Sequence, residues 1–496
     1  KEGPSSPPYS NGQGCSRESM TVNFAYYQSW AAYREDDCNP IAPDELDASL
    51  YTHVAYSFAG INENFELDFY NDAESEALQY EKFMKLREQN PDIKLLISVG
   101  GWLFNDPGPT MRRFSDACKD ENRPTFVNSI VSFLETHGFD GIDLDWEFPG
   151  DYGRGGYPDD KRTYANLVFE LKDAFREAGH DDWEVSMAIP LHPRFLEQGY
   201  DMERLAEGVD LLICMAYNLH GLWDDATYAH SNLYGIMDYL DHFIIDHEFP
   251  TEKMVLGLAP YGRTYTMEDE NCVTMGCPFI RAGPGGCLNQ PFFMMYYSIN
   301  EIIKSGDYDS KIDFNPDTGA SELVFDRNIL VTYDGPEALS YKAQYAKESC
   351  FAGVMWWAAD MLGEPIELKE IEQLLPSQQP SASPSTGEPS SLPSITPSRV
   401  ASDFPSTFPT ATRTPTARPT LPIPTTSPSI APSTLPSAEP TSMPSAKPTN
   451  IPTPSPTSEP TPAPVQKATQ INKLTSSAFR YSYMVPLLTI LIPLIL

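Results

Sequence analysis

The run Asp140-Gly-Ile-Asp143-Leu-Asp145-Trp-Glu147 places four acids within eight residues. Side chains alternate along a strand, so Asp143, Asp145 and Glu147 would share one face of it. Three carboxyl groups on one face cannot all ionise cheaply, and the pKa of one of them must rise towards the working pH. A carboxyl group that keeps its proton can act as a general acid. We predict that Glu147, the outermost, donates a proton to a leaving-group oxygen.

Other interpretations of this run fit its residues less well. A calcium loop of this kind needs Gly and polar residues between the acids, whereas Ile142, Leu144 and Trp146 stand there. A solvated acidic face would not place its acids beside a buried strand. The side chain of Asp140 would point to the opposite face of the strand from the three acids, so we expect a structural role for it. The prediction includes no metal site and no cofactor.

The elements that must position these acids are short apolar runs that alternate with helical patterns. Near-continuous apolar strands of this kind predict an α/β fold, a (β/α)8 TIM barrel with helices outside. Chemistry in such barrels gathers at the C-terminal strand ends, where Glu147 would stand. The candidate strands are 22–27, 53–58, 94–99, 141–144, 184–189, 211–216, 254–259 and 353–357, and the clearest helices are 73–88, 123–137, 161–178 and 337–347.

About ninety residues separate the seventh and eighth candidate strands. They contain a Cys-rich loop, candidate strands at 323–325 and 329–333, and a candidate helix at 299–304. We predict a small α+β insertion over about 266–335, beside the mouth of a barrel domain that spans 21–375.

The eight cysteines indicate an oxidising compartment. Cys272, Cys277 and Cys287 lie in a Gly/Pro-rich stretch without a nearby His, which favours disulfides over zinc. Cys214 lies in an apolar run and is predicted to be a small buried side chain. The pairing of the others cannot be deduced from the sequence.

The two ends differ in composition from the barrel domain. Residues 1–20 begin without Met, so we interpret them as the leader of a mature chain whose signal peptide has been removed. Residues 376–465 hold 24 of the 47 prolines and predict an extended, disordered Pro/Ser/Thr linker. Residues 466–496 end in an apolar run, 484–496, that is short for a bilayer span and follows small residues. This pattern predicts a lipid-anchor (GPI) signal and membrane attachment at the cell surface or wall, with an ordinary membrane tail as the alternative.

Charge is also unevenly distributed. Residues 1–375 hold 65 of the 69 acidic residues and 27 of the 34 basic ones, a net charge of about −38. So acidic a surface repels phosphate backbones, which argues against a nucleic-acid partner. We expect a monomer.

The acidic run resembles the signature of glycoside hydrolase family 18, the chitinases, whose acids have the same four spacings. The resemblance continues in order over residues 22–362 and covers six further strand ends. These are Tyr26-Tyr27-Gln-Ser-Trp30, Phe58, Ser98-Val-Gly100-Gly101 with Trp102, Met215-Ala-Tyr217, Tyr261-Gly-Arg263 and Met355-Trp-Trp357. The loop from Cys272 to Cys287 looks most like the killer-toxin-related fungal branch of the family.

The resemblance implies hydrolysis of β-1,4 bonds in chitin or chito-oligosaccharides, with the substrate's own N-acetyl group as nucleophile. It implies that Glu147 is acid and then base, that Asp145 orients the acetamido group, and that Asp143 shares the proton behind it. Tyr217 would donate a hydrogen bond to the acetamido oxygen. The implied substrate-binding residues are Tyr26, Phe58, Trp102, Met215, Asn218, Tyr261, Arg263 and Trp357, with Trp357 as the floor, and Gly100, Gly101 and Asp140 would be structural.

One residue departs from the family pattern, because Asn218 stands where Asp usually follows Met-x-Tyr. We expect this change to alter the pH dependence or to lower the rate. Two alternatives stay open: an endo-β-N-acetylglucosaminidase that cuts glycoprotein glycans, and a chitin-binding lectin. The intact Glu147 weighs against the lectin, and the insertion together with Tyr261-Gly-Arg263 favours a chitinase.

Overall fold

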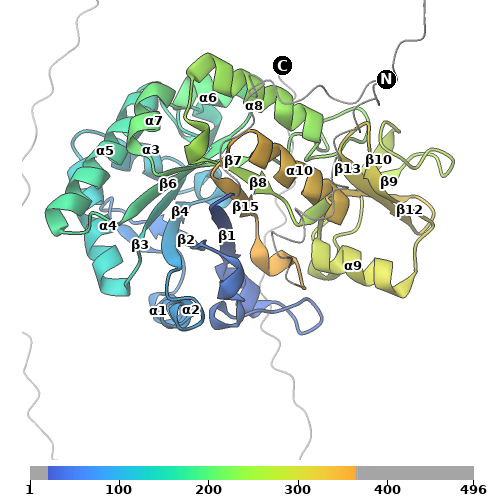
Figure 1. The fold of residues 1–496 in the computed structure, drawn as a ribbon, viewed down its shortest axis with the longest axis horizontal. Coiled ribbons are helices and arrows are strands. Elements are labelled where there is room, and N and C mark those ends of the chain that lie inside the picture. The colour runs from blue at the N-terminus through green and yellow to red at the C-terminus, as the bar shows by residue number, and fades with distance from the viewer. Residues whose placement is uncertain (1–19, 365, 367–496) are drawn as a thin grey trace, which may run out of the picture. The chain divides into compact units, whose positions relative to one another are not determined.

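The computed structural model describes residues 20–364 and 366, and its centre is a closed barrel of eight parallel strands (Figure 1). In barrel order the strands are β1 (Val22–Gln28), β2 (His53–Ile61), β4 (Lys94–Gly100), β5 (Gly141–Asp145), β6 (Glu184–Pro190), β7 (Leu211–Met215), β8 (Met254–Leu258) and β15 (Gly353–Trp356). Pairing of β1 with both β15 and β2 closes the barrel. A short strand, β3 (Leu67–Phe69), pairs antiparallel with β2. The predicted (β/α)8 fold is confirmed.

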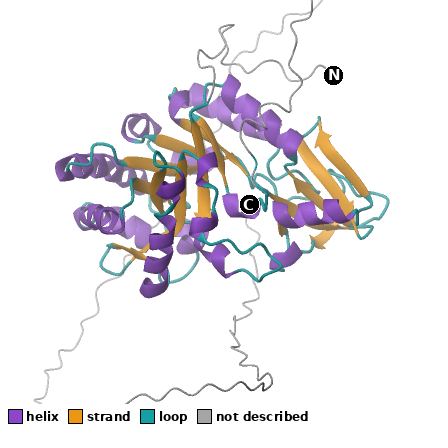
Figure 2. Cartoon of the chain, turned by 60° about the horizontal axis from the view of Figure 1, so that its bottom comes forward, coloured by secondary structure: helices purple, strands orange, loops and turns teal. Residues whose placement is uncertain are grey.

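Helices surround the barrel (Figure 2). Helix α4 has Pro124 in its first turn and is followed by Gly138, whose φ of 80° is the left-handed conformation that closes helices. The predicted helix 73–88 is interrupted at Met84 and Lys85. The helices are α1 (Ala73–Phe83), α2 (Leu86–Gln89), α3 (Arg113–Cys118), α4 (Arg123–His137), α5 (Asp160–Ala178), α6 (Pro193–Gly199), α7 (Met202–Gly208), α8 (Leu233–His247) and α10 (Pro336–Glu348).

The insertion between β8 and β15 forms a second lobe built on a six-stranded antiparallel sheet, at the right of Figure 1. It begins at Tyr261, close to the end of β8 and earlier than the predicted 266. Its elements are β9 (Tyr261–Met267), β10 (Phe279–Ala282), β11 (Phe293–Met295), α9 (Tyr296–Ser305), β12 (Ser310–Asn315), β13 (Ala320–Phe325) and β14 (Ile329–Tyr333). The predicted strands at 323–325 and 329–333 belong to β13 and β14.

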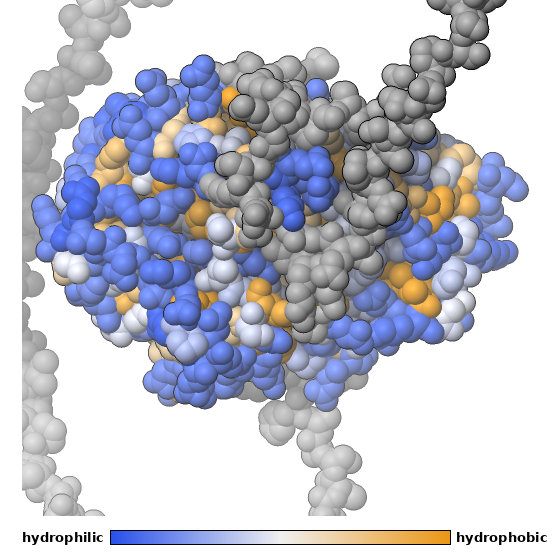
Figure 3. All heavy atoms as spheres, in the orientation of Figure 1, coloured by the Kyte–Doolittle hydropathy of each residue, from blue (hydrophilic) through white to orange (hydrophobic). Residues whose placement is uncertain are grey.

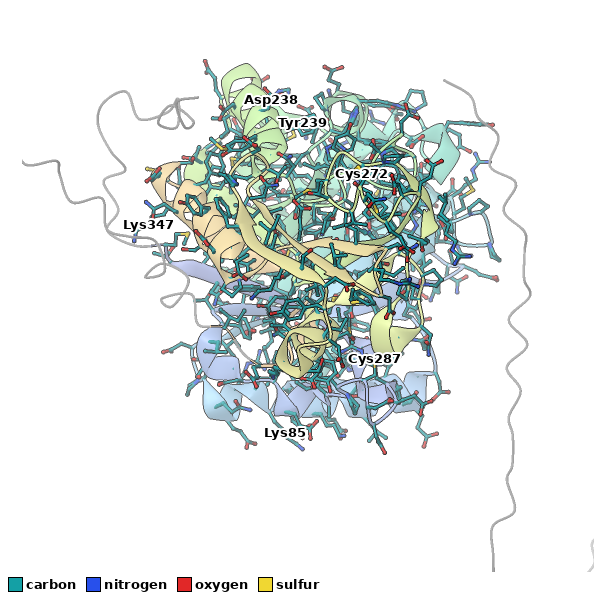
Figure 4. All side chains as sticks on the ribbon, turned by 90° about the vertical axis from the view of Figure 1, so that its right-hand side faces the viewer. Lys85, Asp238, Tyr239, Cys272, Cys287 and Lys347 are labelled. Carbon is teal, nitrogen blue, oxygen red and sulfur yellow. A yellow bond between two sulfur atoms is a disulfide. The ribbon has the colours of Figure 1, made fainter. Side chains whose placement is uncertain are left out.

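Of the two disulfides with both partners in the described residues, one joins distant parts of the chain and the other is local. Cys38, in the loop after β1, pairs with Cys287 of the insertion, whereas Cys272 pairs locally with Cys277. Figure 4 shows Cys272 and Cys287 at well-separated places on the insertion lobe. Cys350 is also disulfide-bonded. Cys214 is free and buried, as predicted.

The described residues include no helix long and apolar enough to cross a membrane and no group of three or more side chains suited to a metal. Within that part of the chain, the face drawn in Figure 3 is mostly hydrophilic, with scattered hydrophobic side chains. The predicted leader, the Pro/Ser/Thr linker and the terminal apolar run lie outside the described residues, apart from Met20.

Candidate active site

A cleft of about 710 Å³ opens where the barrel strands end. Asp143 and Asp140 do not line it, and neither do Tyr261 and Arg263. The sequence-predicted residues that line it are Tyr26, Phe58, Gly100, Gly101, Trp102, Asp145, Glu147, Met215, Tyr217, Asn218 and Trp357. These side chains come from six strands or the loops that follow them, so the barrel brings together residues that are up to 331 positions apart.

The acids are oriented by the packing of Trp146, whose side chain points to the opposite face from theirs and is buried against the helices. Trp146, which is fully buried, stacks on Phe114 of α3 with ring centroids 4.9 Å apart. It also meets Tyr164 of α5 edge-on at 5.1 Å. Because this face is fixed against the helices, the alternate residues Asp143, Asp145 and Glu147 point to the barrel interior.

Asp143 lies deepest and is surrounded by hydroxyl groups. Its Oδ2 accepts hydrogen bonds from Ser98 Oγ at 2.6 Å and Tyr26 Oη at 2.9 Å, and its Oδ1 accepts one from Ser186 Oγ at 2.7 Å. Burial raises the pKa of Asp143, and these three hydroxyls oppose the rise. Three donors favour the ionised form of this carboxyl group.

Asp145 lies between the other two acids. Burial first, then the charges of Glu147 and Asp143, raise the pKa of Asp145 well above its usual range. Its Oδ1 is buried and has no hydrogen-bond partner among the described residues. A buried polar atom without a partner is costly, so this oxygen is suited to accept a hydrogen bond from a ligand N–H or O–H group.

Glu147 lies at the surface of the cleft and is partly exposed. Burial raises its pKa to about 7, the positive charge of Arg154 lowers it, and the negative charge of Asp106 raises it. A carboxyl group with this pKa can donate a proton near neutral pH and accept one back.

Arg154 joins the loop after β5 to the loop after β4. Its Nε donates to the Glu147 carbonyl oxygen at 2.9 Å, and its guanidinium carbon lies 3.7 Å from the centre of the Trp102 ring. It also forms an ion pair with Asp106 and donates to the Trp102 carbonyl oxygen. Sequence reasoning missed Arg154 and Asp106, because both lie in loops several residues beyond the strand-end motifs.

Aromatic rings form the floor and rim of the cleft. Trp357 meets Tyr26 edge-on at 5.2 Å and stacks on Phe58 at 5.8 Å, and Phe58 in turn lies 6.2 Å from Trp30. Trp102 is 52% exposed and Trp30 45% exposed. Both rings line the cleft, and apolar surface gathered in one groove marks a binding site, whereas single exposed rings do not. Trp30 belongs to the first-strand motif but is not among the predicted site residues.

Two glycines allow β4 to end close to β5. Gly100 has φ +109°, and a Cβ there would lie 2.3 Å from the Asp145 carbonyl oxygen. Gly101 has φ +81°, and a Cβ there would lie 2.6 Å from the Phe58 ring. Any side chain at either position would push the Asp145 backbone or Phe58 out of place.

Two side chains of β9, in the insertion, donate hydrogen bonds to Asn218. Its Oδ1 accepts hydrogen bonds from Tyr261 Oη at 2.9 Å and from Arg263 Nη2 at 2.5 Å. Arg263 also lies 4.7 Å from the Phe292 ring centre. Tyr261 and Arg263, predicted to bind substrate, therefore contact Asn218 and do not line the cleft themselves.

Asp140 lies at the start of β5, away from the cleft. Its Oδ2 accepts hydrogen bonds from Arg87 Nη2 at 2.7 Å and from the Leu95 backbone N–H at 2.8 Å. It joins β5 to β4 and α2 at that end of the barrel.

Known proteins resemble this chain across the barrel. The family model described as "Glycosyl hydrolases family 18" matches residues 22–361. A chitotriosidase-1 from Mus musculus is 30% identical over 354 residues, which cover 68% of this chain and 72% of that protein. An endochitinase from Manduca sexta is 30% identical over 358 residues, which cover 68% of this chain and 63% of that protein.

Among solved structures, the GH18 chitinase from Cycas revoluta in complex with (GlcNAc)3 has a TM-score of 0.61 and 26% identity, and the match covers 71% of this chain and 98% of that one. The chain belongs to glycosyl hydrolase family 18.

Proposed function

We propose that this chain is a chitinase that hydrolyses β-1,4 bonds between N-acetylglucosamine units with retention of anomeric configuration. The observation that supports this proposal most strongly is the set of three acids on one strand face. Glu147 lies in the cleft, where burial raises its pKa to about 7, and the Asp145 Oδ1 atom is buried without a hydrogen-bond partner among the described residues. Relatives named chitotriosidase and endochitinase support the same activity.

In the proposed first step, the acetamido oxygen of the substrate attacks its own anomeric carbon. The bond from that carbon to the bridging oxygen breaks, and Glu147 transfers its proton to the departing oxygen. Asp145 accepts a hydrogen bond from the acetamido N–H, for which its unpartnered Oδ1 is suited. Negative charge there stabilises the positive charge that develops on the acetamido group.

In the second step, Glu147 accepts a proton from water as the water oxygen attacks the anomeric carbon and the acetamido oxygen leaves. Two inversions at one carbon give net retention. Tyr217, whose ring lies at the cleft wall, donates a hydrogen bond to the acetamido oxygen. Asp143, held behind Asp145 by three hydroxyl donors, shares one proton with it, so the pair keeps one negative charge beside the acetamido group.

The aromatic floor suits a sugar chain, because sugar rings have flat C–H faces that stack on indole and phenol rings. In this proposal Trp357 stacks beneath the sugar unit whose bond is cleaved, and Phe58 and Trp30 stack beneath the units that follow. A lectin on this fold would have no use for a carboxyl group poised near neutral pH. An endo-β-N-acetylglucosaminidase shares the chemistry and differs in the glycan it accepts.

The same proposal covers where the chain acts. Disulfides such as Cys38–Cys287 are typical of oxidising compartments, so we place the enzyme outside the cell. Attachment through a lipid at a processed C-terminus rests on the composition of residues 466–496 alone, and membership of the killer-toxin-related branch rests on the loop from Cys272 to Cys287 alone.

Assays of chitin, soluble chito-oligosaccharides and a glycoprotein, run side by side with product identification, test this function. We expect N-acetylated oligosaccharides from the first two and no glycan release from the third. Glycan release without chitin cleavage would favour the glucosaminidase, and binding to chitin without any cleavage would favour the lectin.

A further inference from the structure

The lining of the cleft includes a group of residues beside Trp30 that belong to the barrel wall, to the loops next to it and to helix α1. They are Ser29, Tyr33, Tyr56, Tyr70, Glu76 and Gln79, and we call this part of the cleft the side chamber. Tyr56 points outward from β2 towards α1, where its ring lies 4.8 Å from that of Tyr80. The chamber therefore lies beside the barrel and not above the acids.

Gln79 contributes a buried hydrogen-bond acceptor to this chamber. Its side chain is 8% exposed, and its Nε2 donates to Tyr33 Oη at 3.0 Å. Its Oε1 is buried without a hydrogen-bond partner in the described part of the chain. A buried amide oxygen left unpaired is costly, which points to a ligand group that donates a hydrogen bond to it.

Ser29 and Tyr56 contribute a donor. The two side chains are 6% and 0% exposed, and Tyr56 Oη is buried without a hydrogen-bond partner among the described residues. Two hydroxyls carry two O–H groups, and a bond between them can use at most one. At least one O–H is therefore available for an acceptor within the chamber.

Glu76 limits what the chamber can bind. The carboxyl group, 4% exposed, accepts hydrogen bonds from Asn71 Nδ2 at 2.7 Å and from the Tyr70 backbone N–H at 3.0 Å. Burial raises the pKa of Glu76. Both oxygens are already engaged, and the acid disfavours an anionic ligand. A neutral group with one donor and one acceptor fits the chamber best.

An N-acetyl group has this chemistry, because its N–H donates, its carbonyl accepts and its methyl packs on aromatic rings such as Tyr33 and Tyr70. We propose that the side chamber binds the N-acetyl group of a sugar unit remote from the scissile bond. In this arrangement Gln79 Oε1 accepts from the N–H, and the Ser29–Tyr56 pair donates to the carbonyl. This inference rests on the proposed function and adds a preference for long, acetylated chains.

The test uses Gln79→Leu, which removes the acceptor at similar volume together with the hydrogen bond to Tyr33 Oη. The double variant Ser29→Ala/Tyr56→Phe removes the donors. Tyr27→Phe is the matched control, because it loses a buried hydroxyl that donates to the Ile41 carbonyl oxygen and does not line the chamber. Calorimetry on the Glu147→Gln background gives the Kd for fully acetylated chitohexaose. Steady-state assays give kcat/KM for the hexamer and for a chromogenic disaccharide glycoside.

Each chamber variant should weaken hexamer binding and kcat/KM about 10-fold, the effect of one lost buried hydrogen bond. Disaccharide hydrolysis should stay within about 2-fold, because that substrate ends before Trp30. Hexamers with free amines at the remote units should bind the parent about 10-fold more weakly and should not respond to Gln79→Leu. Unchanged hexamer binding in both chamber variants, or tighter binding of the free amines, would overturn the inference. Chamber-dependent binding without hydrolysis of any substrate would refute the proposed function and leave the chamber assignment standing.

Discussion

Replacing Asp106 with Asn should move the alkaline limb of the pH–rate profile to lower pH. Glu147 must be protonated to act as an acid, so kcat/KM falls as pH rises through its pKa of about 7. The Asp106 charge raises the pKa of Glu147. Removing that charge lowers the pKa, and the limb moves with it.

The order of magnitude of the shift comes from Coulomb's law. Two unit charges on the order of 8 Å apart at an effective dielectric constant of about 40 interact by about 1 kcal/mol, which corresponds to about 0.7 pH units. The Asp106 side chain is 43% exposed, and solvent screens its charge. We therefore expect a shift of about 0.5 pH units.

Arg154→Met should move the same limb in the opposite direction, because the Arg154 charge lowers the pKa of Glu147. The assay is kcat/KM on a soluble chito-oligosaccharide between about pH 4 and 9 at low ionic strength, with Asp173→Asn on the outer surface of α5 as control. An alkaline limb that does not move in Asp106→Asn, or that moves upward, would refute this account of the Glu147 pKa.

Three further substitutions probe the rest of the account. Asn218→Asp adds a negative charge beside Arg263 and should shift the pH–rate profile of kcat/KM, so an unchanged profile would remove Asn218 from the electrostatics of the site. Tyr217→Phe should lower kcat about 10-fold or more with little change in KM, because its hydrogen bond strengthens in the transition state, and equal changes in both would contradict that role. Asp334→Asn should lower the free energy of unfolding in urea by about 3–5 kcal/mol, since it leaves Lys342 buried without its ion-pair partner. The double change Asp334→Asn/Lys342→Met should cost less, and additive losses would contradict the pairing.

Much of this architecture could be predicted because its patterns are local. The barrel strands are near-continuous apolar runs. The last residue of each observed strand lies within three positions of the last residue predicted for it. The shared face of Asp143, Asp145 and Glu147 follows from the two-residue period of a strand. Trp146 on the opposite face fixes that choice by packing against Phe114.

The remainder depends on contacts between distant loops, which have no local pattern. Arg154 reaches Trp102 and Asp106 across 52 and 48 positions, and Cys38 pairs with Cys287 across 249. Tyr261 and Arg263 occupy the expected strand end, but their side chains reach Asn218 and not the cleft. Sequence position placed these residues near the site without giving the direction of their side chains.

The rate of Glu147→Gln is the measurement that bears most directly on the proposed mechanism. Gln is nearly the same size as Glu but cannot donate the acid proton. With Kd for chitohexaose measured in parallel, we predict a fall in kcat of about 10²–10⁴ and little loss of binding. A variant that keeps its wild-type rate would contradict the assignment of Glu147 as the acid.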